Sequence, residues 1–168
     1  MTKNNLLIFG GIALIIYMAT KKASATTSAT SPAITPASGG STTIPKGKYF
    51  QLNEFHSGDG EKVPTKYYTN LQELINNLDI IRESIGKPMR INSGYRSVKH
   101  NAKVGGKKNS YHLRAMAADI RVIGMTPVQF RAELEKLIAS GKIKQGGVGS
   151  YPTFTHYDIR GTKSRWSS

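Results

Sequence analysis

The stretch SYHLRAMAADIRV, residues 110–122, contains the spacing on which the expected fold depends. His112 is followed by Asp119 seven positions later, which is not the i,i+4 spacing of neighbouring side chains on a helix. The spacing suits a loop histidine that leads into a strand at residues 117–122, with the aspartate pointing back towards the histidine. Ala117 and Ala118 are small enough to let that strand pack closely. Because such a spacing often arises by chance, it is a weak indication of a metal site when taken alone.

A helix is expected before this stretch, at residues 70–85, where apolar side chains recur at the spacing of one helix face. These side chains are Leu71, Leu74, Ile75, Leu78, Ile81 and Ile85. Asn70 and Glu73 can form a capping box at the start, and Gly86 can end the helix.

A second helix is expected after the stretch, from Thr126 and Pro127 to Gly141, because proline is favoured at the first helical position and glycine just past the last. Further strands are expected at residues 89–92 and 154–159. Turns are expected at the intervening glycines, which are Gly94, Gly105, Gly106 and those of residues 146–149. The mixture predicts an α+β domain in which helices pack against a small antiparallel sheet.

The chain has no cysteine and four histidines, so any metal site must use histidine nitrogen and carboxylate oxygen. His156 and Asp158 lie two positions apart on an expected strand, whose alternation turns both to one face together with Phe154. A histidine and an aspartate buried on one face are costly unless they are paired or bound to metal. The residues alone leave two interpretations open, a structural His–Asp hydrogen bond and a metal site.

The N-terminal part of the chain differs in composition. Residues 6–20 are apolar and uncharged, a run shorter than the about 17–25 residues of a full membrane span. A pair of lysines follows and argues against cleavage as a signal peptide, so residues 1–22 are expected to be an uncleaved membrane anchor, with a cleaved signal segment as the alternative. Residues 23–45 contain mainly Ala, Ser, Thr, Pro and Gly and are expected to be a flexible linker to a folded domain at residues 46–168.

The formal net charge is +14, from 24 Lys and Arg against 10 Asp and Glu. Such a surface attracts polyanions, including anionic lipids and anionic wall polymers. Nucleic acid is not expected as a partner, because no nucleic-acid-binding motif is present and the aromatic residues are not interleaved with basic ones. The same charge is compatible with a solvated surface that keeps the domain soluble.

Several short segments form a set: SGYRS and HNAKVGG at 93–97 and 100–106, SYH and AADI at 110–112 and 117–120, GGVG at 146–149, and HYDIR and RW at 156–160 and 165–166. Together they resemble the zinc D-Ala-D-Ala carboxypeptidase family, which includes L-alanyl-D-glutamate endopeptidases and shares its fold with the hedgehog signalling domain. They occur in the expected order and cover nearly all of residues 50–166. As a set they are specific, and they imply a hedgehog-type metallopeptidase fold.

The resemblance implies zinc held by His112, Asp119 and His156. It also implies that Arg96 lies in the cleft and either polarises the scissile carbonyl or binds a substrate carboxylate, for which a guanidinium is suited. The alternative for Arg96 is a surface ion pair. Ser110 is expected to fix the loop before the first ligand, and the other two histidines are expected to be structural or peripheral.

The catalytic carboxylate is the role in which this sequence departs most from the family's pattern. Several branches carry an acid three residues before the last histidine, where Thr153 stands here and cannot act as a base. Another branch has the H-x-D form, so Asp158 is expected to be either the general base or the residue that orients His156. Glu54 is the reserve candidate. A smaller departure is Ala115, which replaces a glycine common three residues after the first ligand.

The expected function is zinc-dependent hydrolysis of D-amino-acid-containing peptide bonds of bacterial peptidoglycan, by a carboxypeptidase or an endopeptidase. The expected partners are peptidoglycan peptides and the membrane, with the catalytic domain facing the cell wall. The protein would act in wall remodelling or, if encoded by a phage, in entry or lysis from the virion membrane. The alternative is a non-catalytic zinc-containing domain that binds the wall or another protein.

Overall fold

The computed structural model describes residues 43–168. The expected anchor at residues 1–22 and nearly all of the expected linker lie outside the described residues. Between residues 43 and 168, no helix combines the length and the apolar character that a membrane crossing requires. The elements are, in chain order, η1 (Leu52–Phe55), η2 (Thr65–Tyr67), α1 (Tyr68–Ile85), β1 (Met89–Ser93), α2 (Val98–Lys103), η3 (Tyr111–Arg114), β2 (Ala117–Val122), α3 (Pro127–Ala139), β3 (Gly147–Ser150), β4 (Thr155–Asp158) and β5 (Ser164–Ser167).

The five strands form one sheet in the order β1-β2-β4-β3-β5. The first three neighbouring pairs are antiparallel, whereas β3 and β5 are parallel. The α+β class is confirmed, but the sheet is mixed, so the prediction of an antiparallel sheet is wrong at β5. Arg165 holds β5 beside β3, because its guanidinium donates to the carbonyl of Gly146, next to β3, and pairs with Glu135 of α3.

The glycine run at residues 146–149 lies largely in strand β3, where the sequence predicts a turn. These glycines allow close approach of neighbouring groups, which is a different use of the residue from turning the chain. A Cβ on Gly146 would overlap the carbonyl oxygen of Asp158, and a Cβ on Gly149 would overlap the indole of Trp166. The prediction of a turn is therefore wrong.

The two long helices lie where the apolar spacing predicts them. A capping box starts α3, with Thr126 and Gln129 each accepting a hydrogen bond from the other's backbone N–H. α1 ends at Gly86, which has the left-handed φ of 61° typical of a helix C-cap glycine. α1 begins at Tyr68, two residues before the predicted start, so Asn70 lies inside the helix and the predicted capping box with Glu73 is wrong. The Asn70 amide instead donates to the carbonyl of Arg114 at 3.0 Å.

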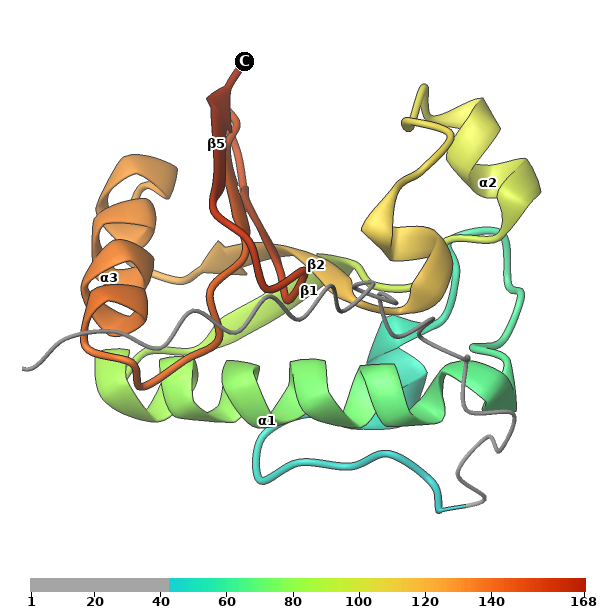
Figure 1. Cartoon of the computed structure of the whole chain (residues 1–168), viewed down its shortest axis with the longest axis horizontal. Coiled ribbons are helices and arrows are strands. Elements are labelled where there is room, and N and C mark those ends of the chain that lie inside the picture. Colours follow the sequence, from blue (N-terminus) through green and yellow to red (C-terminus); the bar gives the residue numbers. More distant parts are fainter. Residues whose placement is uncertain (1–42) are drawn as a thin grey trace, which may run out of the picture. The chain divides into compact units, whose positions relative to one another are not determined.

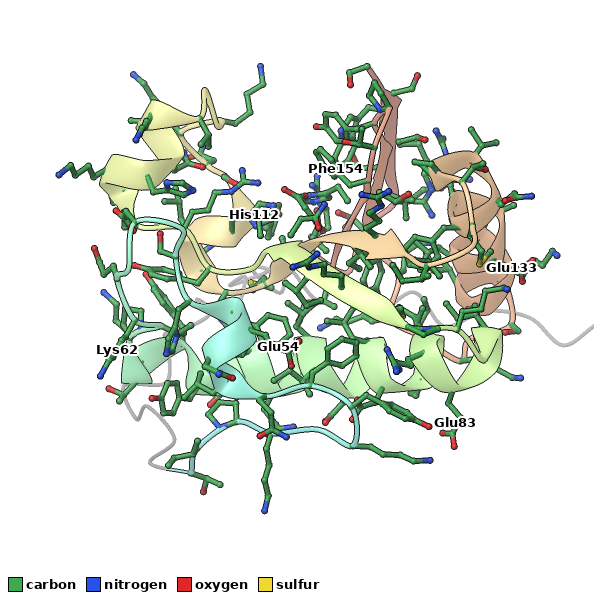
Figure 2. The ribbon with its side chains drawn as sticks, turned by 180° about the vertical axis from the view of Figure 1, so that it is seen from behind. Glu54, Lys62, Glu83, His112, Glu133 and Phe154 are labelled. Atoms are coloured by element: carbon green, nitrogen blue, oxygen red, sulfur yellow. The ribbon has the colours of Figure 1, made fainter. Side chains whose placement is uncertain are left out.

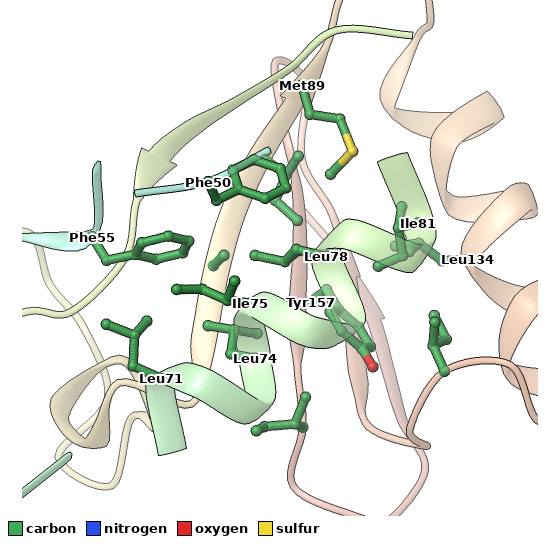
Figure 3. Close-up of a cluster of buried hydrophobic side chains, with 14 of the residues drawn as sticks. Phe50, Phe55, Leu71, Leu74, Ile75, Leu78, Ile81, Met89, Leu134 and Tyr157 are labelled. Carbon is green, nitrogen blue, oxygen red and sulfur yellow. The ribbon is translucent and has the colours of Figure 1, made fainter. Parts of the chain in front are cut away.

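The core lies between α1 and the sheet. α1 covers one face of the sheet, and α2 lies on the other side of the sheet from α1 (Figure 1). Figure 3 shows the buried face of α1 against Phe50, Phe55 and Tyr157. Side chains alternate along β4, so Tyr157 enters this core while His156 and Asp158 turn to the opposite face. That opposite face carries the polar groups described below.

Truncating the core should destabilise the domain strongly. Leu74 is fully buried in α1, so Leu74→Ala should lower the free energy of unfolding by about 2–5 kcal/mol, through lost burial and the cavity left behind. Ile80 lies on the same helix with 38% of its surface exposed, and Ile80→Ala is the matched control with a much smaller expected loss. Urea unfolding followed by circular dichroism measures both, and equal losses would contradict the described packing of α1.

Candidate metal centre

Three potential ligand side chains meet where η3, β2 and β4 come together. The antiparallel register pairs Asp119 of β2 directly with His156 of β4, and His112 reaches the same point from η3. His112 Nε2 lies 3.2 Å from both His156 Nδ1 and Asp119 Oδ1, and His156 Nδ1 lies 2.9 Å from Asp119 Oδ1. All three side chains are buried. The structure thus brings together the three residues that the family resemblance names as zinc ligands.

Hydrogen bonds on the far side of each imidazole fix which nitrogen carries a proton. His112 Nδ1 lies 2.6 Å from the carbonyl oxygen of Gly94, which can only accept, so Nε2 presents a lone pair to the centre. His156 Nε2 lies 3.0 Å from Asp158 Oδ2 and donates to it, which leaves Nδ1 facing the centre. Three acceptor atoms therefore face one another and need a cation between them, either a metal ion or a proton on His156 Nδ1.

The triangle of donor atoms fits a metal ion. Zinc binds imidazole nitrogen and carboxylate oxygen at about 2.0–2.2 Å, which in a tetrahedral site separates the ligand atoms by about 3.3 Å. The observed separations of 2.9–3.2 Å are close to that value. A proton on His156 Nδ1 could serve the contact with Asp119, but it would leave His112 Nε2 without a good donor. Three protein ligands also leave one position open, as in catalytic zinc sites.

The electrostatics favour the protonation state that a metal requires at His112 and Asp119, whereas His156 must give up a proton when a metal binds. Burial lowers the pKa of His112, so this imidazole is neutral at neutral pH. Burial alone would raise the pKa of Asp119, but its close contacts with the His112 and His156 rings outweigh burial and hold that pKa well below its usual range. Burial also lowers the pKa of His156, but the hydrogen bonds with Asp119 and Asp158 outweigh this and raise it overall. The centre therefore attracts positive charge.

Two arginine–aspartate pairs flank the triangle. On one side, Arg96 pairs with Asp119 Oδ2. On the other, Asp158 is fully buried and accepts hydrogen bonds from Arg160 Nε and Nη2 at 2.8 and 2.6 Å. Asp158 therefore lies behind His156, at the ring nitrogen that points away from the triangle.

Comparison with known proteins agrees with this arrangement. The model of the peptidase M15 family matches residues 48–158, a range that contains all three converging side chains. The chain belongs to the peptidase M15 family. It is also 39% identical over 72 residues to the "Probable peptidoglycan L,D-endopeptidase MepK" of Haemophilus influenzae. That match covers 39% of this chain and 36% of the relative, so the chain spans about a third of the length of this curated relative.

The centre of this M15 domain lies in a cleft of about 890 Å³. Figure 2 shows His112 between the part of the chain around α2 and the turn between β3 and β4 that carries Phe154. The wall at Phe154 is aromatic and includes Tyr151 and Trp166, and the facing wall comes from residues 104–110. The other cleft residues that the sequence singles out are Arg96, His56 and His100, of which neither histidine belongs to the triangle.

Apart from Asp119, Glu54 is the one carboxylate among the described residues that line the cleft. Its Oε1 accepts a hydrogen bond from the backbone N–H of Gln51 at 2.7 Å. Asp158 is not part of the lining. These positions favour Glu54 for contact with a substrate or water, and Asp158 for orienting His156.

The loop before β2 is held by local backbone geometry. Ser110 Oγ accepts a hydrogen bond from the backbone N–H of His112 at 3.3 Å, which is the loop-fixing contact that the sequence predicts. Ala115 has a φ of 53° and is the one non-glycine residue with positive φ in the described part of the chain. A glycine would adopt this conformation without steric cost.

Sequence reasoning missed two groups that orient the site. The carbonyl of Gly94 accepts from His112, and a Cβ on Gly94 would lie 2.7 Å from the Cα of Phe55, so the position requires glycine. Arg160 holds Asp158 from behind. Its position two residues after Asp158 was the available signal, because residues two apart in an extended segment face the same way.

Proposed function

We propose that this protein is a zinc-dependent peptidase that hydrolyses peptide bonds of bacterial peptidoglycan, with zinc held by His112, Asp119 and His156. The observation that carries the proposal is the convergence of three acceptor atoms within 3.2 Å of one another in an open cleft. Membership of the M15 family supports a metallopeptidase. The peptidoglycan substrate is supported by the name of the relative.

The proposed chemistry is metal-assisted amide hydrolysis. Bound zinc would lower the pKa of a water molecule to about 7 and polarise a carbonyl group. Arg96 holds Asp119 and faces the cleft, where its charge stabilises the negative charge that develops on the scissile carbonyl oxygen. Gly94 and Asp158 fix the two imidazole rings so that their lone pairs point to one spot.

Glu54 is the proposed proton acceptor. A general base must come within about 2.6–3.2 Å of the proton that it takes, either directly or through one water. Glu54 lines the cleft, whereas the Asp158 carboxylate is fully buried and occupied by Arg160, His156 and the backbone N–H of Gly147. Of the two carboxylates that the sequence nominates, Asp158 is proposed to orient its neighbour and Glu54 to act on the substrate.

The bond and the place of action are part of the same proposal. The name of the relative favours an endopeptidase over a D-Ala-D-Ala carboxypeptidase. The apolar run at residues 6–20 favours a domain that is anchored in a membrane and faces the cell wall, for remodelling or, in a phage, for entry or lysis.

The test uses the full chain, freed of metal with a chelator and reloaded with zinc. Purified peptidoglycan and soluble muropeptides are incubated with both forms, and the products are identified by mass spectrometry. Cleavage should require zinc, and new amino and carboxyl termini should identify the bond. Stoichiometric zinc without any cleavage would sink the peptidase proposal and favour the non-catalytic binding domain.

A further inference from the structure

The two walls of the cleft differ in free positive charge. Three lysine or arginine side chains line the cleft: Arg96, Lys107 and Arg160. Both arginines form ion pairs with buried carboxylates, Arg96 with Asp119 and Arg160 with Asp158. Lys107 forms no ion pair with any residue from 43 to 168. It therefore presents an unpaired positive charge to the cleft.

Lys107 belongs to a larger basic surface, which we call the α2 lobe and define as residues 97–110. The lobe contains four lysines and no acidic residue, and all four lysines are exposed: Lys99, Lys103, Lys107 and Lys108. None of their ammonium groups forms an ion pair within the described part of the chain. The lobe thus has a net positive charge next to the candidate metal centre.

The backbone that carries these lysines is fixed in place. Asn101 is 4% exposed and its amide donates to the carbonyl of Lys107 at 3.1 Å, while the N–H of Gly106 donates to the carbonyl of Asn101 at 2.8 Å. At the start of the lobe, Ser97 Oγ donates to Asp59 Oδ2 at 2.6 Å. A fixed backbone places the charges at a constant position relative to the cleft, which favours selective binding over loose attraction.

The opposite wall offers no unpaired charge of this kind. Tyr151 and Phe154 stack with ring centroids 4.4 Å apart, and Trp166 donates from its indole nitrogen to the Tyr151 hydroxyl at 3.0 Å. The cation nearest to Trp166 in sequence, Arg165, is paired with Glu135. A chain lying across the centre would therefore meet cations on one side and aromatic surface on the other.

We propose that the α2 lobe binds free carboxylates of the substrate peptide, with Lys107 as the residue closest to the reacting bond. The inference rests on the proposed peptidase function and adds the class of substrate: acidic peptides are preferred over their amidated forms. A set of several unpaired cations fits a peptide with more than one carboxylate. The aromatic wall would contact the uncharged part of the same substrate.

The experiment compares two synthetic wall peptides that differ only in free or amidated carboxylates away from the scissile bond. The full chain loaded with zinc should cut the free acid about 3–10-fold better in kcat/KM at low salt, mainly through KM, since exposed charge pairs contribute modestly. The preference should shrink at about 0.5 M salt, where the screening length falls well below its value of about 8 Å at 0.15 M. Lys107→Glu should bring the ratio to one or below while kcat stays within about twofold.

Lys142→Glu is the matched control, because it makes the same charge change at an exposed residue that does not line the cleft. It should keep the preference. Equal cleavage of both peptides by the wild type, or an unchanged ratio in Lys107→Glu, would overturn the proposal.

Binding of both peptides to the metal-free full chain by calorimetry provides an independent readout. If neither peptide is cut but the free acid still binds more tightly through Lys107, the peptidase proposal fails and the lobe proposal stands.

Discussion

His112→Ala should remove the bound metal and reduce peptide hydrolysis to background. The remaining two ligand atoms, from Asp119 and His156, cannot hold zinc in a site that normally requires three protein ligands. The loss of activity should be larger than the loss of about 10–100-fold that follows removal of a residue hydrogen-bonded to a ligand. Elemental analysis gives zinc per chain of the purified full-length protein, and mass spectrometry of muropeptide products gives turnover.

His100→Ala is the control for this change. His100 lines the same cleft but is not one of the three converging residues, and its ring packs over Gly58. The variant should keep about one zinc per chain and measurable turnover. A His112→Ala protein that retains full zinc and full activity would show that the ligand assignment is wrong.

Much of the candidate metal centre could be predicted because strand alternation is a strict rule. It places His156 and Asp158 on one face of β4 and Tyr157 on the other, and the structure shows this division. The seven-residue spacing from His112 to Asp119 is by contrast ambiguous on its own. The spacing indicates a metal site only once the strand register is known to pair Asp119 with His156. Register depends on tertiary contacts, so the spacing alone does not reveal it.

The fold was predictable where apolar spacing is long and regular, as in α1 and α3, and not where short segments depend on tertiary contacts. β5 is four residues long and polar apart from Trp166, so its parallel pairing with β3 has no periodic signal. β3 is rich in glycine, which by itself indicates a turn. Its strand conformation follows from close approach to Asp158 and Trp166, which a single sequence does not reveal.

The role of Asp158 shows a further limit of sequence reasoning. Alternation places it beside His156, but it does not say which ring nitrogen it meets. Which nitrogen Asp158 meets depends on the orientation of the His156 ring. It also depends on Arg160, whose guanidinium binds Asp158 through two nitrogens. A carboxylate at the outer nitrogen orients the ring, whereas one at the open side of the metal could have acted as a base.

Asp158→Asn should therefore weaken zinc binding by about 10–100-fold and lower turnover at limiting zinc. The change keeps the size of the side chain but removes the charge that aligns the His156 ring and pairs with Arg160. Competition with a chromophoric chelator measures zinc affinity on the full chain. Turnover should recover to within a few-fold of wild type when zinc is saturating, because the residue does not touch the substrate.

Glu54→Gln tests the complementary assignment, in which Glu54 is the general base and Asp158 orients His156. Glu54 lines the cleft and contacts none of the three converging residues through a hydrogen bond, so its variant should bind zinc normally and lose about 100-fold or more in turnover at saturating zinc. The opposite pattern would reverse the assignment. If Asp158→Asn keeps zinc affinity but remains inactive at saturating zinc, while Glu54→Gln stays active, then Asp158 is the base and the His156 ring must swing away from the described orientation during the reaction.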